Sequence, residues 1–177
     1  MRAKLLLAAM LALPLFAAAQ TVDQQKLDSF SKAVADAEGF GVKHAIPTRY
    51  HNPGDLKTIP SAAKLPGQKA IGKGGHVVFK SDAAGWAALK DQIAKMVDGR
   101  SKHFNPNMTL QQVARKYAGN WRPWVKIVSR ELGVTPSTTL AEILVAPAPQ
   151  AQVTEDADLD LTLFGVFPFD NQFDPQN

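Results

Sequence analysis

The sequence of 177 residues contains no cysteine. This absence excludes disulfide bonds as a source of stability, and it excludes a cysteine nucleophile. The four histidines, His44, His51, His76 and His103, do not have the spacing of a metal site. No serine–histidine–aspartate arrangement stands out either. We therefore expect a protein that works without a metal and without any other cofactor.

Long apolar runs are also absent after the first twenty residues. At the start of the chain, Arg2 and Lys4 precede an apolar run over 5–16, and three alanines at 17–19 follow it. This pattern is typical of a cleaved secretory signal peptide, and the run is short for a membrane span. We expect residues 1–19 to be removed and the mature protein to be periplasmic or secreted, without stable membrane insertion. The alternatives are an uncleaved anchor or a misread start.

Positive charge is missing from the end of the chain, where residues 150–177 hold six acidic side chains and no Lys or Arg. The whole chain has a net charge of +4, of which Arg2 and Lys4 supply two. Because the tail contributes −6, the body over 20–149 carries +8. A basic exported body suits an anionic partner such as cell wall, lipopolysaccharide, a membrane surface or nucleic acid. Export argues against nucleic acid, and charge alone does not choose among the others.

The hydrophobic periodicity predicts an α+β fold that is mainly helical, with one small β-hairpin. Helices are expected over about 23–38, 81–97, 109–118, 123–132 and 139–144, a long ordered loop over 39–66, and hairpin strands over 68–71 and 76–80. From Pro147 the composition changes to an Ala/Pro linker. We therefore divide the chain into a signal peptide over 1–19, a domain over 20–146, and a linker with an acidic, partly apolar tail over 147–177.

The first helix ends in a carboxylate that the pattern places on its buried side. Leu27, Phe30 and Val34 recur at helical spacing, and Glu38 falls close to the same stripe. Gly39 follows as a plausible left-handed cap. Burial without a cation raises a carboxyl pKa, so Glu38 is a candidate proton donor near neutral pH. The alternative is that Glu38 is merely the exposed end of a surface helix.

Five features follow one another in a characteristic order: Glu38-Gly39 at a helix end, the turn over 52–56, Val78-Phe79 in a hairpin, a Gly85-Trp86 helix, and the run over 117–120. This order, which covers about 25–145, resembles the lysozyme-like superfamily, and most closely the phage and bacterial lytic transglycosylase-type muralysins. In that superfamily the catalytic Glu ends a helix that packs against a small β-element, and a tyrosine helps to hold it.

The resemblance implies a lysozyme-like domain over 20–146 with catalytic roles for Glu38 and Tyr117. The alternative for Tyr117 is simple core packing. The chain departs from the usual motifs, because Gly39 replaces the Ser that follows the Glu and Ala118 replaces an Asn.

Candidate substrate-binding residues lie in the long loop and between two helices. Arg49, His51 and Asn52 are polar residues of an ordered loop, which is a common place for binding groups. Asp55 follows in the same loop, although its alternative is a plain turn residue. Trp121 offers an indole face on which a sugar could stack.

These observations predict an exported, monomeric enzyme that cuts the MurNAc–GlcNAc glycan strands of peptidoglycan and binds no nucleic acid. A hydrolase needs a second carboxylate, for which Asp55 is the best candidate. A lytic transglycosylase needs only Glu38, because the 6-hydroxyl of the substrate itself attacks. Since Asp36 points away around the helix, the single-carboxylate route is favoured. Two alternatives remain: a non-catalytic wall-binding or structural protein with the same fold, and a basic antibacterial effector or inhibitor module.

Overall fold

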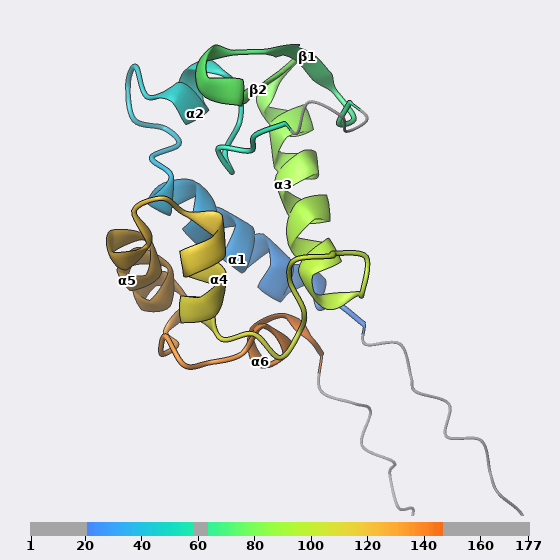
Figure 1. The fold of residues 1–177 in the computed structure, drawn as a ribbon, viewed down its shortest axis with the longest axis vertical. Helices are drawn as coiled ribbons and strands as arrows, with labels where there is room; N and C mark the ends of the chain where they lie inside the picture. The colour runs from blue at the N-terminus through green and yellow to red at the C-terminus, as the bar shows by residue number, and fades with distance from the viewer. Residues whose placement is uncertain (1–20, 59–63, 147–177) are drawn as a thin grey trace, which may run out of the picture. The chain divides into compact units, whose positions relative to one another are not determined.

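The computed structural model describes residues 21–58 and 64–146, and in these ranges the fold is mainly helical with a small antiparallel sheet (Figure 1). The helices are α1 (Gln24–Ala37), α2 (Ile46–Arg49), α3 (Asp82–Val97), α4 (Leu110–Tyr117), α5 (Trp121–Leu132) and α6 (Leu140–Leu144). The strands are β1 (Gln68–Ile71) and β2 (Val77–Phe79), joined by a 3₁₀ turn over Lys73–Gly75. The predicted signal peptide and the predicted tail lie outside the described residues.

Most helices begin where the sequence predicts, and a capping side chain marks each of these starts. The Asp23 side chain accepts hydrogen bonds from two backbone N–H groups at the start of α1. Ser81 accepts one at the start of α3. Thr109 and Thr139 each complete a capping box with the third residue of the following helix. The left-handed Gly133 (φ 66°) ends α5. These local bonds satisfy N–H groups that a helix end otherwise leaves unpaired.

Five helices share one core, in which α1 packs against α3, α5 and α6, and α4 packs against α5. The largest fully buried side chains of this core are Phe30, Val34, Leu89, Ile93, Met96, Leu110, Val113, Val128, Leu140 and Leu144. Leu56, Val77, Phe79 and Ala88 form a second, smaller cluster. Since Ala88 lies on α3, this helix takes part in both clusters and connects the helical part to the hairpin (Figure 1).

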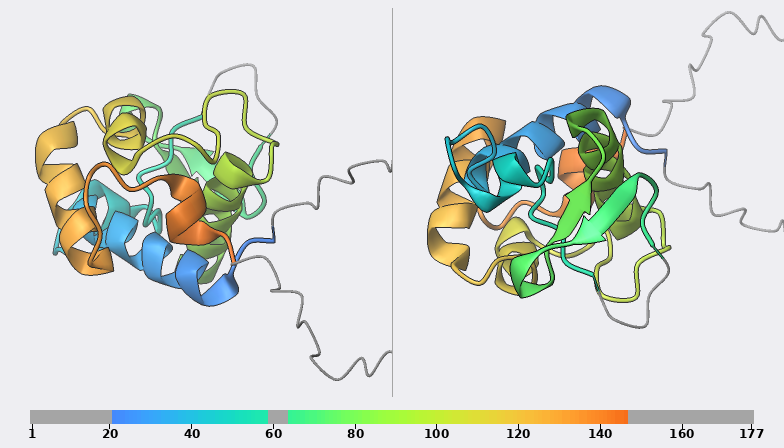
Figure 2. Two further views of the ribbon diagram at one scale, coloured as in Figure 1. Left: turned by 90° about the horizontal axis from the view of Figure 1, so that it is seen from below. Right: turned by 90° about the horizontal axis from the view of Figure 1, so that it is seen from above.

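The hairpin forms as the sequence predicts, with Ile71 opposite Val77 and Gln68 opposite Phe79. The view from above in Figure 2 shows the two strands side by side. The segment over 39–66, expected to be loop throughout, contains the short helix α2. Four residues are too few for a hydrophobic period, so the pattern gave no signal for this helix.

The loop after α2 approaches α3 so closely that only glycine fits at the point of contact. A Cβ atom at Gly85 would lie 1.9 Å from the backbone oxygen of His51 and 2.8 Å from Cδ of Pro53. Gly85 therefore allows the loop over 51–56 to lie against α3, and this loop supplies one wall of the site described below.

The two ends of the described domain are bound to each other. The backbone N–H of Asp23 donates to Leu144 O at 2.9 Å, and the N–H of Ala146 donates to Thr21 O at 3.2 Å. Lys26 Nζ donates to Val145 O at 2.9 Å. No helix in the described residues is both long and apolar enough to cross a membrane.

Candidate active site

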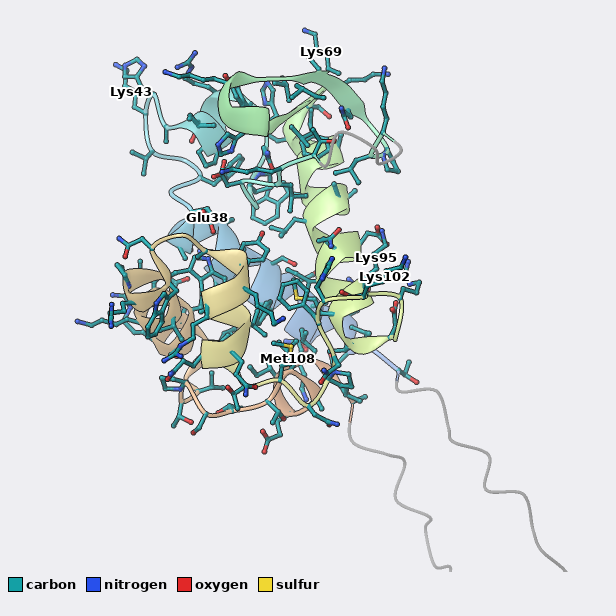
Figure 3. The ribbon with its side chains drawn as sticks, viewed as in Figure 1. Glu38, Lys43, Lys69, Lys95, Lys102 and Met108 are labelled. Carbon is teal, nitrogen blue, oxygen red and sulfur yellow. The ribbon has the colours of Figure 1, made fainter. Side chains whose placement is uncertain are left out.

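The C-terminal end of α1 positions Glu38. Its backbone N–H donates to Val34 O at 2.9 Å, and Gly39 leaves the helix in the left-handed conformation (φ 80°). The N–H of Phe40 then donates back to Ala35 O at 2.9 Å, which is the hydrogen bond of a Schellman-type ending. Figure 3 shows Glu38 at the end of α1 nearest α2 and the hairpin. The Glu38 side chain is half-buried, on the side of the helix where the apolar stripe of α1 predicts it.

Glu38 lines a cavity of about 210 Å³ between the helical part and the loop over 51–56. The cavity is lined by Glu38, Gly54, Asp55, Leu56, Lys57, Tyr117, Ala118 and Gly119. Three segments that are far apart in the sequence thus meet at one place: the end of α1, the turn after α2, and the end of α4. Of the predicted site residues, Glu38, Asp55 and Tyr117 come together here.

Trp124 of α5 holds the Glu38 carboxylate. Its indole Nε1–H donates to Glu38 Oε1 at 2.9 Å, and the residue is 3% exposed. Trp124 belongs to the core of the helical part, and helical spacing carries no information on where an indole N–H points. The hydrogen bond to Glu38 is therefore a finding of the structure alone.

Tyr117 occupies the cavity in a different way from the one the resemblance implies. Its hydroxyl donates to Gly54 O at 2.7 Å, and its ring lies 5.5 Å from that of Trp124, centroid to centroid. Tyr117 thus holds the turn over 52–56, while Trp124 supplies the hydrogen bond to Glu38. Burial raises the pKa of Tyr117, and the charges of Glu38 and Asp55 raise it further, so the hydroxyl stays a donor.

Asp55 shares the cavity with Glu38. Its backbone is left-handed (φ 47°), and its Oδ1 lies 2.6 Å from Nδ1 of His76, beside β2. Burial raises the pKa of Asp55, while His76 and Lys57 oppose this shift. The side chain is therefore more than a turn former, because it brings a second carboxylate to the site. His76 was not predicted as a site residue, since nothing local pairs it with Asp55, and neither was Lys57, which lines the cavity.

The environment of Glu38 favours its protonated form. Burial, and then the negative charge of Asp55, raise the pKa of Glu38 from 4.5 to about 7. The Trp124 hydrogen bond and the charge of Lys57 act in the opposite direction. A carboxyl group with this pKa is present in both protonation states at neutral pH, as an acid–base catalyst requires.

The side chain of Asn52 is completely buried and does not line the cavity, in contrast to its predicted role as a substrate-binding residue. Its Nδ2 donates to the backbone oxygens of Leu56 and Val77, both at 2.9 Å, and its Oδ1 accepts from the N–H of Leu56 at 2.8 Å. The bond to Val77 fastens the turn to β2, and the two bonds with Leu56 close the turn itself. Asn52 therefore shapes the wall of the cavity from behind.

The other three predicted binding residues do not line the cavity. The Arg49 guanidinium lies 5.8 Å from the centroid of the Tyr50 ring, and His51 Nδ1 lies 2.6 Å from Oδ1 of Asp82. Trp121 has two guanidinium groups within 5 Å of its ring centroid, at 4.6 and 4.8 Å. A sugar that stacks on Trp121 has to compete with these two cations. Substrate binding by Arg49, His51 and Trp121 stays a prediction.

A larger hollow of about 420 Å³ lies between α1, α5 and α6. Its ionisable side chains already have structural tasks: Asp23 and Glu142 cap helices, and Lys26 bonds to Val145 O. The smaller cavity around Glu38 is therefore the better candidate for chemistry. Within residues 21–58 and 64–146, no group of three or more His, Asp or Glu side chains has the arrangement of a metal site.

Comparisons with protein-family models, with curated proteins and with solved structures found no match. The likeness to the lysozyme-like superfamily accordingly stays a resemblance, based on the residues named in the sequence analysis.

Proposed function

We propose that this protein is an exported enzyme that cleaves the glycan strands of peptidoglycan, with Glu38 as the acid–base group. The observation that carries the proposal is the half-buried Glu38, held by Trp124 in a cavity, with a pKa of about 7. Cleavage of a glycosidic bond requires a protonated carboxyl group beside the leaving oxygen. The order of motifs along the chain gives the substrate class, and the basic body suits an anionic wall.

In the first step, Glu38 transfers its proton to the oxygen that links MurNAc to GlcNAc. The bond between this oxygen and C1 of MurNAc breaks, and positive charge develops on the sugar ring. Glu38 is then ionised, and in this state the Trp124 N–H donates to a charged oxygen, which strengthens the hydrogen bond. The geometry thus stabilises the carboxylate at the moment at which it forms.

The lytic transglycosylase is the first of two routes for the second step. The 6-hydroxyl of MurNAc attacks C1, and the Glu38 carboxylate accepts the hydroxyl proton. The product has a 1,6-anhydromuramyl end, and Glu38 is protonated again for the next cycle. This route uses no other carboxylate.

The second candidate is a lysozyme-type hydrolase, and the position of Asp55 specifically favours it. The sequence alone places a single carboxylate, Glu38, which favours the transglycosylase, whereas the cavity is lined by both Glu38 and Asp55. An ionised Asp55 beside His76 would stabilise positive charge on the sugar or activate water. Its product has a reducing muramic acid end.

Mass analysis of a digest of purified peptidoglycan tests the proposal and separates the routes. New anhydromuramyl ends, retained in Asp55→Asn, support the transglycosylase. New reducing ends, lost in Asp55→Asn, support the hydrolase. If the folded protein produces neither kind of end but sediments with peptidoglycan, cleavage is refuted in favour of a non-catalytic wall-binding protein.

A further inference from the structure

The positive charge of the domain is concentrated in one part of it. We define the hairpin lobe as residues 41–80, which contain α2, β1 and β2 and are described over 41–58 and 64–80. The lobe has seven Lys and Arg residues and one acidic residue, Asp55, so its net charge is +6. The body over 20–149 carries +8 in total. Forty residues therefore hold most of the excess charge.

Among the described residues, the Lys and Arg side chains of the lobe form no ion pair, although the charge of Lys57 acts on Glu38 and Asp55. The one acidic side chain of the lobe, Asp55, faces the cavity and pairs with His76. In the part of the chain that the structure describes, the ion pairs of Lys and Arg all lie in α1, α3, α5 or the loop after α3, and none includes a Lys or Arg of the lobe. Figure 3 shows Lys43 and Lys69 at the end of the molecule that α2 and the hairpin form.

Exposed apolar side chains occur in the same lobe. Among the described residues, the large apolar side chains that are exposed are Val42, at 59%, and Ile71, at 56%. Val42 is next to Lys43, and Ile71 lies between Lys69 and Lys73 on β1 and the following turn. Lysine on an edge strand also prevents unwanted strand pairing, but this role would explain Lys69 alone, since Lys73 lies beyond the strand.

From this juxtaposition we propose that the hairpin lobe docks on the surface of an anionic lipid bilayer. Lysine side chains would lie at the phosphate headgroups, and Ile71 would enter the boundary between headgroups and acyl chains. A soluble polyanion offers no apolar phase and so gives no use for Ile71. The docking residues Lys69, Ile71 and Lys73 do not line the Glu38 cavity, and the proposal does not depend on the proposed enzymatic activity.

Co-sedimentation with vesicles tests the docking surface. We expect the purified protein to bind vesicles of 30% phosphatidylglycerol in phosphatidylcholine, to ignore pure phosphatidylcholine, and to bind more weakly as salt increases. The double variant Lys69→Gln/Lys73→Gln should bind the anionic vesicles roughly 10- to 30-fold more weakly. Ile71→Ser should also weaken binding while leaving the charge unchanged.

The matched control is Lys102→Gln/Lys126→Gln, which removes the same charge from exposed positions outside the lobe. It should change vesicle binding by less than about twofold, because only charges close to the bilayer act on it strongly. An equal loss in both double variants would overturn the proposal in favour of a non-specific effect of net charge.

Two further results would also overturn it. The first is equal binding to neutral and anionic vesicles. The second is binding to duplex DNA or polyphosphate that is as tight as binding to vesicles and insensitive to Ile71→Ser, which would assign the lobe to a soluble polyanion. Glu38→Gln should bind vesicles like the parent protein, so this test and the test of cleavage fail independently.

Discussion

Replacing Trp124 with Phe tests how the cavity sets the proton affinity of Glu38. The change keeps an aromatic ring against Tyr117 and removes the N–H that donates to Glu38 Oε1 at 2.9 Å. A hydrogen bond to a charged group contributes about 1.5–3 kcal/mol, and one pKa unit corresponds to about 1.4 kcal/mol. Because Glu38 is partly accessible to water, we expect the lower end of this range.

The prediction is therefore that Trp124→Phe raises the pKa of Glu38 from about 7 by roughly one further unit. The sign follows from the fact that the hydrogen bond stabilises the ionised form, so its loss favours the protonated form. The chain contains four Glu residues, and labelling their side-chain carboxyl carbons allows the titration to be followed by NMR without any assay of activity. If the protein cleaves glycan strands, the decline of activity at alkaline pH should move by the same amount.

Trp86→Phe is the matched control, because it shortens another indole that packs on the same core and lies against Phe40. It should leave the titration of Glu38 in place. A Glu38 pKa that stays the same or falls in Trp124→Phe would refute the role given to the indole, and an equal rise in both variants would indicate a general loosening of the core.

Three further predictions concern stability. Glu38→Gln should unfold at a higher denaturant concentration than the parent at pH 8, and at about the same concentration at pH 4. Because the pKa of Glu38 is raised in the folded state, its ionisation destabilises that state as the pH rises from 4.5 through about 7. The free energy of unfolding lost by the parent is about 1–3 kcal/mol after allowance for partial exposure. Equal stabilities at pH 8 would contradict the shift. Asn52→Ala should lower the free energy of unfolding, measured by chemical denaturation, by about 2–4 kcal/mol, since it removes the partner of buried backbone groups of Leu56 and Val77. A loss below about 1 kcal/mol would show that the turn does not depend on Asn52. Ending the chain after Ala146 should leave the melting temperature nearly unchanged, because Val145 and Ala146 already pair with Val22 and Thr21, and the sequence that follows is an Ala/Pro linker and an acidic tail. A large drop would show that the tail contributes to the fold.

The helices were predictable because their signals are local. An apolar stripe and a capping residue lie within one segment of sequence, as at Asp23 in α1 and Thr109 in α4. The hairpin was predictable for the same reason, from two β-rich runs around a glycine turn. The helix α2 was not, because four residues that include Pro47 show no hydrophobic period.

The site was predictable only in part. The position of Glu38 follows from helical spacing, but the direction of Asp55 depends on a left-handed backbone and on His76, which is distant in the sequence. The burial of Asn52 and the direction of the Trp124 N–H depend on tertiary packing in the same way. Residue type and spacing thus predict which segments meet, and they do not predict which atoms within them form bonds.

The measurement that tests the central claim most directly is the rate of release of soluble fragments from purified peptidoglycan by the parent protein, Glu38→Gln and Asp36→Asn. Asp36 is the exposed carboxylate two residues before Glu38, and it pairs with Lys32 at the surface. Loss of the acid–base group should reduce the rate by about 10²–10⁴, while Asp36→Asn should keep the parent rate. A folded Glu38→Gln variant that releases fragments as fast as the parent would contradict the account.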